Sequence, residues 1–131
     1  MRRMCILLLA LGGVAGYWWF RTYEPVGVIQ EQLAAIDEGQ YSRAYEYLSS
    51  TTRATLTFEE FVAMVQNNSV VMEIRGTSLS TRAREGSMAM ISGVLKGYGE
   101  LTCQASYVLV VEEGDWKIQS FHWAPPRRDR S

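Results

Sequence analysis

The sequence holds few of the residues from which metal and cofactor sites are built. Its 131 residues include two cysteines, one histidine and three aspartates. Cys5 lies in an apolar segment near the start and Cys103 lies far along the chain, so we expect no disulfide between them. Two cysteines and one histidine are too few for a typical four-ligand zinc site. We therefore expect neither a structural metal nor a cofactor, and we predict that Cys103 is a small buried apolar residue.

Lysine is also scarce, since only Lys96 and Lys117 occur and arginine supplies the rest of the positive charge. The formal net charge of -1 provides no strongly basic surface for a nucleic-acid backbone. Nucleic acids are therefore excluded from the expected partners. The composition, 47% hydrophobic and 21% charged, is typical of an ordinary globular chain and argues against disorder. The length limits the chain to one domain with a short appendage.

Positive charge is concentrated at the two ends of the chain. Residues 25–126 hold 7 basic and 12 acidic residues, a net charge of -5, whereas the two ends together carry +4. This distribution suits an acidic domain held beside a membrane whose head groups attract arginine. For the arginines within residues 127–131, a solvated basic tail is the simpler interpretation.

The N-terminus is predicted to direct the chain to a membrane. Arg2 and Arg3 precede an uncharged run of 17 residues, 4–20. As a helix this run spans about 25 Å, slightly less than the roughly 30 Å hydrocarbon core of a bilayer. It is either a cleavable signal peptide with a small-residue site at 14–16, or a retained signal anchor with an aromatic belt at 17–20. We favour the anchor because the belt continues the apolar run.

Either interpretation exports the rest of the chain. Because the positive charge that flanks a span stays in the cytoplasm, residues after about 24 are expected on the far side of the membrane. The predicted location is the bacterial cytoplasmic membrane, with a single pass and an extracytoplasmic C-terminal domain, or a secreted domain if the signal is cleaved. The expected organisation is a signal anchor or signal peptide over 1–23, a domain over 24–126 and a basic tail over 127–131.

The first half of the exported body shows helical periodicity. A first helix is predicted to start after Pro25 and to end at residues 37–39 with a glycine stop. A second helix, around residues 40–48, carries one full amphipathic stripe. A third helix opens at residues 57–60, where a threonine and a glutamate form a capping box, and ends at residues 67–69. We therefore predict three helices before the first strand.

From residue 70 onward the apolar period changes from 3.6 to 2, which indicates strands. The predicted strands cover residues 73–82, 87–96, 101–112 and 116–123. In the last of them, alternation places Trp116 and His122 on one face and Phe121 with Trp123 on the other. The sequence therefore predicts an α+β fold, in which three N-terminal helices pack on a curved antiparallel sheet of about four strands.

Two groups of motifs point to a known superfamily. The first comprises residues 28–36, the spacing Gly39-x-Tyr41-x-x-Ala44-Tyr45 and the pair Phe58-x-x-Phe61, and the second comprises residues 106–110 and 113–118. Over about residues 26–123 the chain resembles small exported domains of the cystatin-like, nuclear-transport-factor-2-like (SnoaL-type) superfamily. The resemblance implies a cystatin-like cone, in which a bent sheet wraps around the first helix and leaves a cavity at its open end. It implies no single activity, because the superfamily contains enzymes, ligand carriers and domains of unknown function.

Enzymes of this superfamily, such as ketosteroid isomerase and scytalone dehydratase, use aspartate, histidine and tyrosine inside the cavity. Asp37, Asp115 and Asp129 are predicted to lie at a helix end, in a turn and in the tail, where none suits a buried general base. His122 is the one imidazole of the chain and has no identifiable partner acid or nucleophile. We therefore predict no catalytic residues and no enzymatic activity.

Three functions remain open. We predict a non-catalytic, membrane-tethered extracytoplasmic domain that mediates protein contacts as an accessory subunit or scaffold, with an exposed apolar patch that includes Phe121 and Trp123. The alternative is a carrier or sensor of a small apolar ligand held in the cone cavity. An isomerase or dehydratase is the third. The ligand-binding residues expected for the carrier are Tyr41, Tyr45, Tyr107 and His122.

The expected partners follow from these functions. The membrane is contacted through the N-terminal helix, and the protein partner is either an unidentified chain or a second copy paired through the sheet, as the resemblance implies. A small apolar ligand belongs to the carrier function alone. The simplest interpretation of the large aromatic residues is that they fill the core, because a domain of this size needs most of its large side chains for stability.

Overall fold

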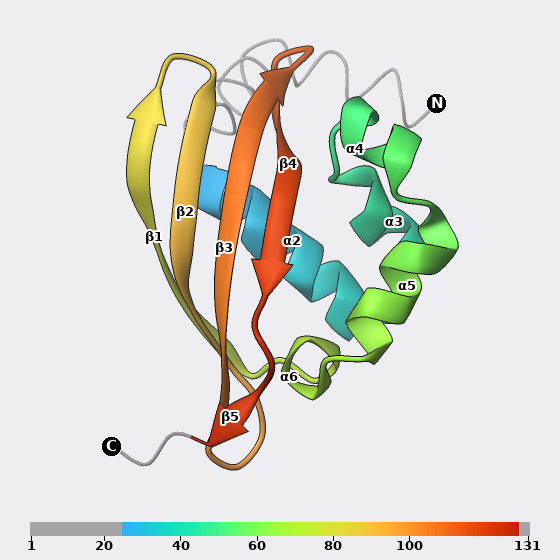
Figure 1. Ribbon diagram of the computed structural model, residues 1–131, viewed down its shortest axis with the longest axis vertical. Helices are drawn as coiled ribbons and strands as arrows, with labels where there is room; N and C mark the ends of the chain where they lie inside the picture. The colour runs from blue at the N-terminus through green and yellow to red at the C-terminus, as the bar shows by residue number, and fades with distance from the viewer. Residues whose placement is uncertain (1–24, 129–131) are drawn as a thin grey trace, which may run out of the picture.

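The computed structural model describes residues 25–128 and confirms an α+β fold. A long helix is followed by four shorter ones and then by an antiparallel sheet (Figure 1). The described helices are α2 (Pro25–Asp37), α3 (Tyr41–Glu46), α4 (Ser50–Thr55), α5 (Phe58–Gln66) and α6 (Ser69–Met72). The prediction of three helices is therefore wrong in number, because α4 and α6 were not foreseen.

Both unforeseen helices are single short segments held by a capping side chain. The side chain of Ser49 accepts a hydrogen bond from the backbone N–H of Thr52 at the start of α4. Asn68 does the same for α6, where its Oδ1 accepts from the N–H groups of Val70 and Val71. A helix of four to six residues has too few positions to show a period in sequence, so only its cap is visible there.

The predicted capping box of α5 is confirmed. The Thr57 hydroxyl accepts from the backbone N–H of Glu60 at 3.1 Å, and the Glu60 carboxylate accepts from the N–H of Thr57 at 2.9 Å. Helix α2 ends as predicted, with Gly39 at φ 77°. That left-handed conformation favours glycine, because a Cβ would crowd the backbone. These two termini fix where α2 stops and where α5 begins.

The sheet contains β1 (Gly76–Glu85), β2 (Met88–Lys96), β3 (Leu101–Glu112), β4 (Asp115–Trp123) and β5 (Arg127–Arg128). The first four strands are antiparallel neighbours in chain order, and β5 pairs with the start of β3 through Leu101 and Arg128. Arg127 and Arg128, which the sequence pattern assigned to the tail, therefore extend the sheet. Strand β3 has the predicted bounds, whereas β1 starts three residues later than predicted, after α6.

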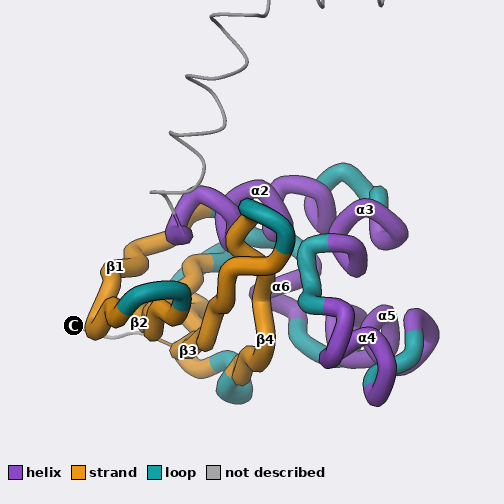
Figure 2. Tube along the Cα trace, turned by 90° about the horizontal axis from the view of Figure 1, so that it is seen from above, coloured by secondary structure: helices purple, strands orange, loops and turns teal. Residues whose placement is uncertain are grey.

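Helix α2 lies across one face of the curved sheet, and α3, α4 and α5 lie beside β4 (Figures 1 and 2). We call the face that packs against α2 the inner face and the opposite one the outer face. The core lies between α2 and the inner face, and its largest fully buried side chains include Tyr107, Phe61, Ile29 and Leu33. Cys103 is also fully buried, which confirms that it is a small core residue.

A β-bulge in β4 changes which side chains face the core. Leu109 pairs with Ile118 and Val108 pairs with Ser120, so one extra residue lies between the two β4 partners. The extra residue reverses the alternation, as a bulge does. Phe121 and Trp123 therefore join the inner face, where their rings lie 6.2 and 6.4 Å from the ring of Phe61. The prediction that these two residues form an exposed patch is wrong for this reason.

The predicted membrane segment, residues 1–23, lies outside the described residues. Among residues 25–128, no helix combines the length and the apolar character that a membrane span requires.

Candidate functional site

Two of the four predicted ligand residues, Tyr41 and Tyr45, lie on α3 and connect helices to one another. The Tyr41 hydroxyl contacts the sulfur of Met72 at the end of α6, at 3.4 Å. The Tyr45 hydroxyl donates to the carbonyl oxygen of Leu56, just before α5, at 2.6 Å. Both side chains are half-buried on the helical side of the molecule. Their contacts are those of residues that hold short helices in place.

The other two predicted ligand residues lie on neighbouring strands but face opposite ways. Tyr107 is buried in the core, and its hydroxyl oxygen accepts a hydrogen bond from the indole N–H of Trp123 at 2.8 Å. His122 is exposed on the outer face. His122 lines a cavity on that face, and Tyr107 borders the same cavity only from β3, because its side chain lies in the core. The structure therefore places the side chains of Tyr107 and His122 on opposite faces of the sheet, while Tyr41 and Tyr45 lie among the helices.

Burial gives Tyr107 a pH-dependent role in stability. Removal from water raises its pKa well above the ordinary value of 10. The folded protein thus keeps the phenolic proton to a higher pH than the unfolded chain does. The neutral phenol makes its whole contribution to the free energy of unfolding below pH 10, and this contribution is lost as the pH rises above that value.

We expect Tyr107→Phe to flatten the decline of stability in alkali. The free energy of unfolding of the wild type should fall by about 1.4 kcal/mol per pH unit above pH 10 through this residue alone. Urea unfolding at pH 8 and pH 11 measures the difference, with exposed Tyr98→Phe as the control variant. An equal decline in the Tyr107→Phe and wild-type proteins would contradict the assignment.

Burial likewise raises the pKa of the Cys103 thiol. The thiol donates to the carbonyl oxygen of Ala124 at 3.0 Å, and the side-chain amide of Asn68 lies 3.6 Å from the sulfur. A buried thiol that keeps its proton is a poor nucleophile and a poor metal ligand. Cys103 therefore serves packing.

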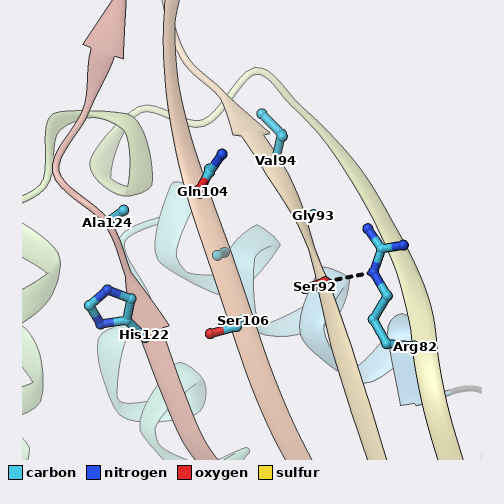
Figure 3. Close-up of a pocket in the computed structure, with 9 residues that line it drawn as sticks. Arg82, Ser92, Gly93, Val94, Gln104, Ser106, His122 and Ala124 are labelled. Atoms are coloured by element: carbon cyan, nitrogen blue, oxygen red, sulfur yellow. Dashed lines mark hydrogen bonds between the residues drawn. The ribbon is translucent and has the colours of Figure 1, made fainter.

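The outer face carries a row of four polar side chains, one from each of the four long strands (Figure 3). We call Arg82, Ser92, Ser106 and His122 the polar row. Ser92 pairs directly with Ser106, and Ser106 pairs directly with His122. Arg82 lies at a register shift in β1, and its Nε donates to the Ser92 hydroxyl at 2.7 Å. The row therefore crosses the sheet from β1 to β4.

Two neighbouring cavities on the outer face share the polar row. The first, of about 400 Å³, also includes Val94, Gln104 and Ala124 in its lining. The second, of about 430 Å³, also includes Met90 and Val108. Because all four residues of the polar row line both cavities, the two form one groove, which we call the outer groove. Each half has a volume typical of a small-molecule site.

The polar side chains of the outer groove determine which ligands it can hold. Its described lining includes a guanidinium group, serine hydroxyls and an imidazole, but no carboxylate. Within residues 25–128, no side-chain hydrogen bond links the Ser106 hydroxyl with the His122 imidazole, so the serine lacks the contact through which a base activates a nucleophile. No group of three metal-ligating side chains occurs in the same residues. Such a set of donors is suited to holding an anion.

Sequence patterns revealed only part of the polar row. The sequence indicates His122 as the one histidine, and the alternation of β3 is consistent with Ser106 on the face opposite Cys103 and Tyr107. Arg82 and Ser92 were missed, because the contact between them depends on the register shift at Arg82. A bulge leaves no reliable mark in a single sequence, so the row is visible only in three dimensions.

Residues 23–130 match the model of one protein family, described as a domain of unknown function, DUF4864. The chain belongs to the DUF4864 family. No curated protein matches the chain in sequence. The DUF4864 match covers every described helix and strand, from the start of α2 to β5. The outer groove therefore lies entirely within the DUF4864 domain.

Proposed function

We propose that this DUF4864 domain is a non-catalytic, membrane-tethered extracytoplasmic domain that binds a protein partner through the outer face of its sheet. The observation that carries the proposal is an apolar area beside the outer groove, which we call the methionine–valine patch: Met88, Met90, Val108 and Val110. Met88 pairs with Val110 and Met90 pairs with Val108 across β2 and β3. The two methionines are 46% and 49% exposed. Flexible methionine side chains suit a surface that adapts to a partner.

The tether is proposed from the ends of the chain. The apolar run at residues 4–20 precedes α2 by only a few residues, so a retained anchor places the domain close to the membrane. The basic residues at both ends would then face anionic head groups, while the net charge of -5 over residues 25–126 would be repelled by the same head groups.

The order of helices and sheet, with α2 against the inner face, also supports a cystatin-like cone.

The carrier alternative requires space on the inner face. Phe61 and Tyr107 are fully buried there, and Phe61 lies against the rings of Tyr45, Phe121 and Trp123. A ligand in that region would have to displace core side chains, at a cost of several kcal/mol. No observation favours the carrier function over the protein contact. Protein binding is therefore the function we propose.

Photo-crosslinking in native membranes tests the proposal. A photoreactive phenylalanine analogue replaces Met90 in the full-length chain, and the control carries it at Met64, which is 38% exposed on α5. We expect a protein adduct from position 90 and none from position 64. An adduct of twice the mass of the chain would identify a second copy as the partner.

The same membranes test the tether, since an anchored chain stays in the pellet after an alkaline carbonate wash. Protein adducts that form equally from positions 64 and 90, or from neither, would refute the contact surface. Release of the intact chain by carbonate would refute the anchor without affecting the contact surface. The two parts of the proposal are therefore separable.

A further inference from the structure

Arg82 is a fixed cation with unused donors. Its Nε hydrogen bond to Ser92 is its one polar contact with the described residues, so its two terminal amino groups have no partner there. A guanidinium group stays charged at all accessible pH values and binds carboxylates through paired N–H donors. The bond to Ser92 fixes the group beside β1, at one side of the outer groove (Figure 3). Less side-chain entropy is therefore lost when an anion binds.

The surroundings of Arg82 make this cation unusual in the molecule. The described domain is acidic, with a net charge of -5 over residues 25–126. The lining of the outer groove nevertheless contains no aspartate or glutamate. Ser106 and His122 continue the row of polar groups from Ser92 toward β4, and their side chains make no hydrogen bond with the described residues. The groove is thus a local site for negative charge on an acidic surface.

One half of the outer groove is apolar. Beyond the polar row, the side chains of Met90 and Val108 line this half, and Met90 is 49% exposed. A charged ligand without a carbon chain would leave this half in contact with water. A ligand that carries both a charge and an apolar chain would cover both halves and gain free energy from each.

We propose that the outer groove binds a small organic carboxylate with a short apolar chain. The carboxylate accepts hydrogen bonds from the terminal amino groups of Arg82, and the chain lies on Met90 and Val108. A carboxylate fits better than a polyphosphate, because Arg82 is the one permanent cation of the groove lining. This site goes beyond the protein contact and shares Met90 with it, so an occupied groove would change the surface that the partner meets.

Titration with hexanoate tests the proposal. Full-length protein with methyl-labelled methionine is placed in phosphatidylcholine nanodiscs, and the Met90 methyl resonance is followed by NMR. We expect a saturable shift with a dissociation constant on the order of 1 mM, as suits a ligand of this size. Hexanol, which lacks the charge, and acetate, which lacks the chain, are each expected to bind at least tenfold more weakly.

Two arginines on β1 provide a matched pair of variants. Arg82→Gln should weaken hexanoate binding about tenfold or more, because it removes the charged donors. Arg84→Gln makes the same charge change two residues away, where the guanidinium lies 5.2 Å from the ring of Trp116, and should change binding less than twofold. Equal loss in the two variants, equal binding of hexanol and hexanoate, or no saturable shift would each overturn the proposal.

Discussion

Phe61→Ala is expected to lower the free energy of unfolding by about 4 kcal/mol, the loss typical of a fully buried phenylalanine. Phe61 has no exposed surface, and its ring centroid lies within 6.4 Å of those of Tyr45, Phe121 and Trp123. The substitution removes one α5 side chain and leaves a cavity between α3, α5 and β4. Since whole domains are stable by only about 5–15 kcal/mol, this one change should bring the protein close to unfolding.

Urea denaturation followed by tryptophan fluorescence measures this loss. The control is Met64→Ala on the same helix, where partial exposure should keep the loss below about 1 kcal/mol. A loss in Phe61→Ala no larger than that in Met64→Ala would show that the aromatic cluster does not form the centre of the domain.

Gly93→Ala is expected to cost about 3 kcal/mol, at the upper end of the usual range for overpacking. A Cβ at position 93 would collide with the carbonyl oxygen of Ser78 and would lie 2.8 Å from the Cα of Leu79. Both of these atoms belong to the β1 backbone, which cannot rotate away as a side chain can. Since Gly93 pairs with Leu79, the strain should act directly on the contact between β1 and β2.

Hydrogen exchange locates the damage in this variant. The β1 amides are expected to exchange faster in Gly93→Ala, while those in the middle of β3 change much less. Gly76→Ala on β1 is the control, because a Cβ there meets nothing within 4 Å. If Gly76→Ala and Gly93→Ala are equally stable, the close approach of β1 to Gly93 is not a constraint on the fold.

The elements that the sequence predicted well are long or have clear end signals. Helix α2 starts at a proline and stops before Gly39, α5 opens with the capping box at Thr57, and β3 alternates over its full length. In each case local side-chain chemistry and the packing of the whole domain favour the same structure. Predictions of this kind need no knowledge of distant contacts.

The features that the sequence did not reveal depend on bulges and on residues far apart in the chain. Because of the bulge in β4, Phe121 and Trp123 lie on the same face of the sheet as Trp116 and pack against the core. Simple alternation had placed them on the face opposite Trp116. The register shift at Arg82 brought its guanidinium to Ser92, ten positions away. Tyr41 and Tyr45, two of the ligand residues predicted from the sequence, contact Met72 and Leu56 through their hydroxyl groups, and no sequence pattern indicated these contacts.

The last described residues act against unwanted association. Strand β3 is twelve residues long, and β4 pairs with it only from Ala105 onward. Past β4, the backbone N–H of Ala124 donates to the carbonyl oxygen of Gln104, and β5 then pairs with Leu101 and Thr102. Without these contacts, the beginning of β3 would present open backbone donors and acceptors, to which a strand of another molecule could add. The C-terminal segment thus protects the protein from aggregation through its longest strand.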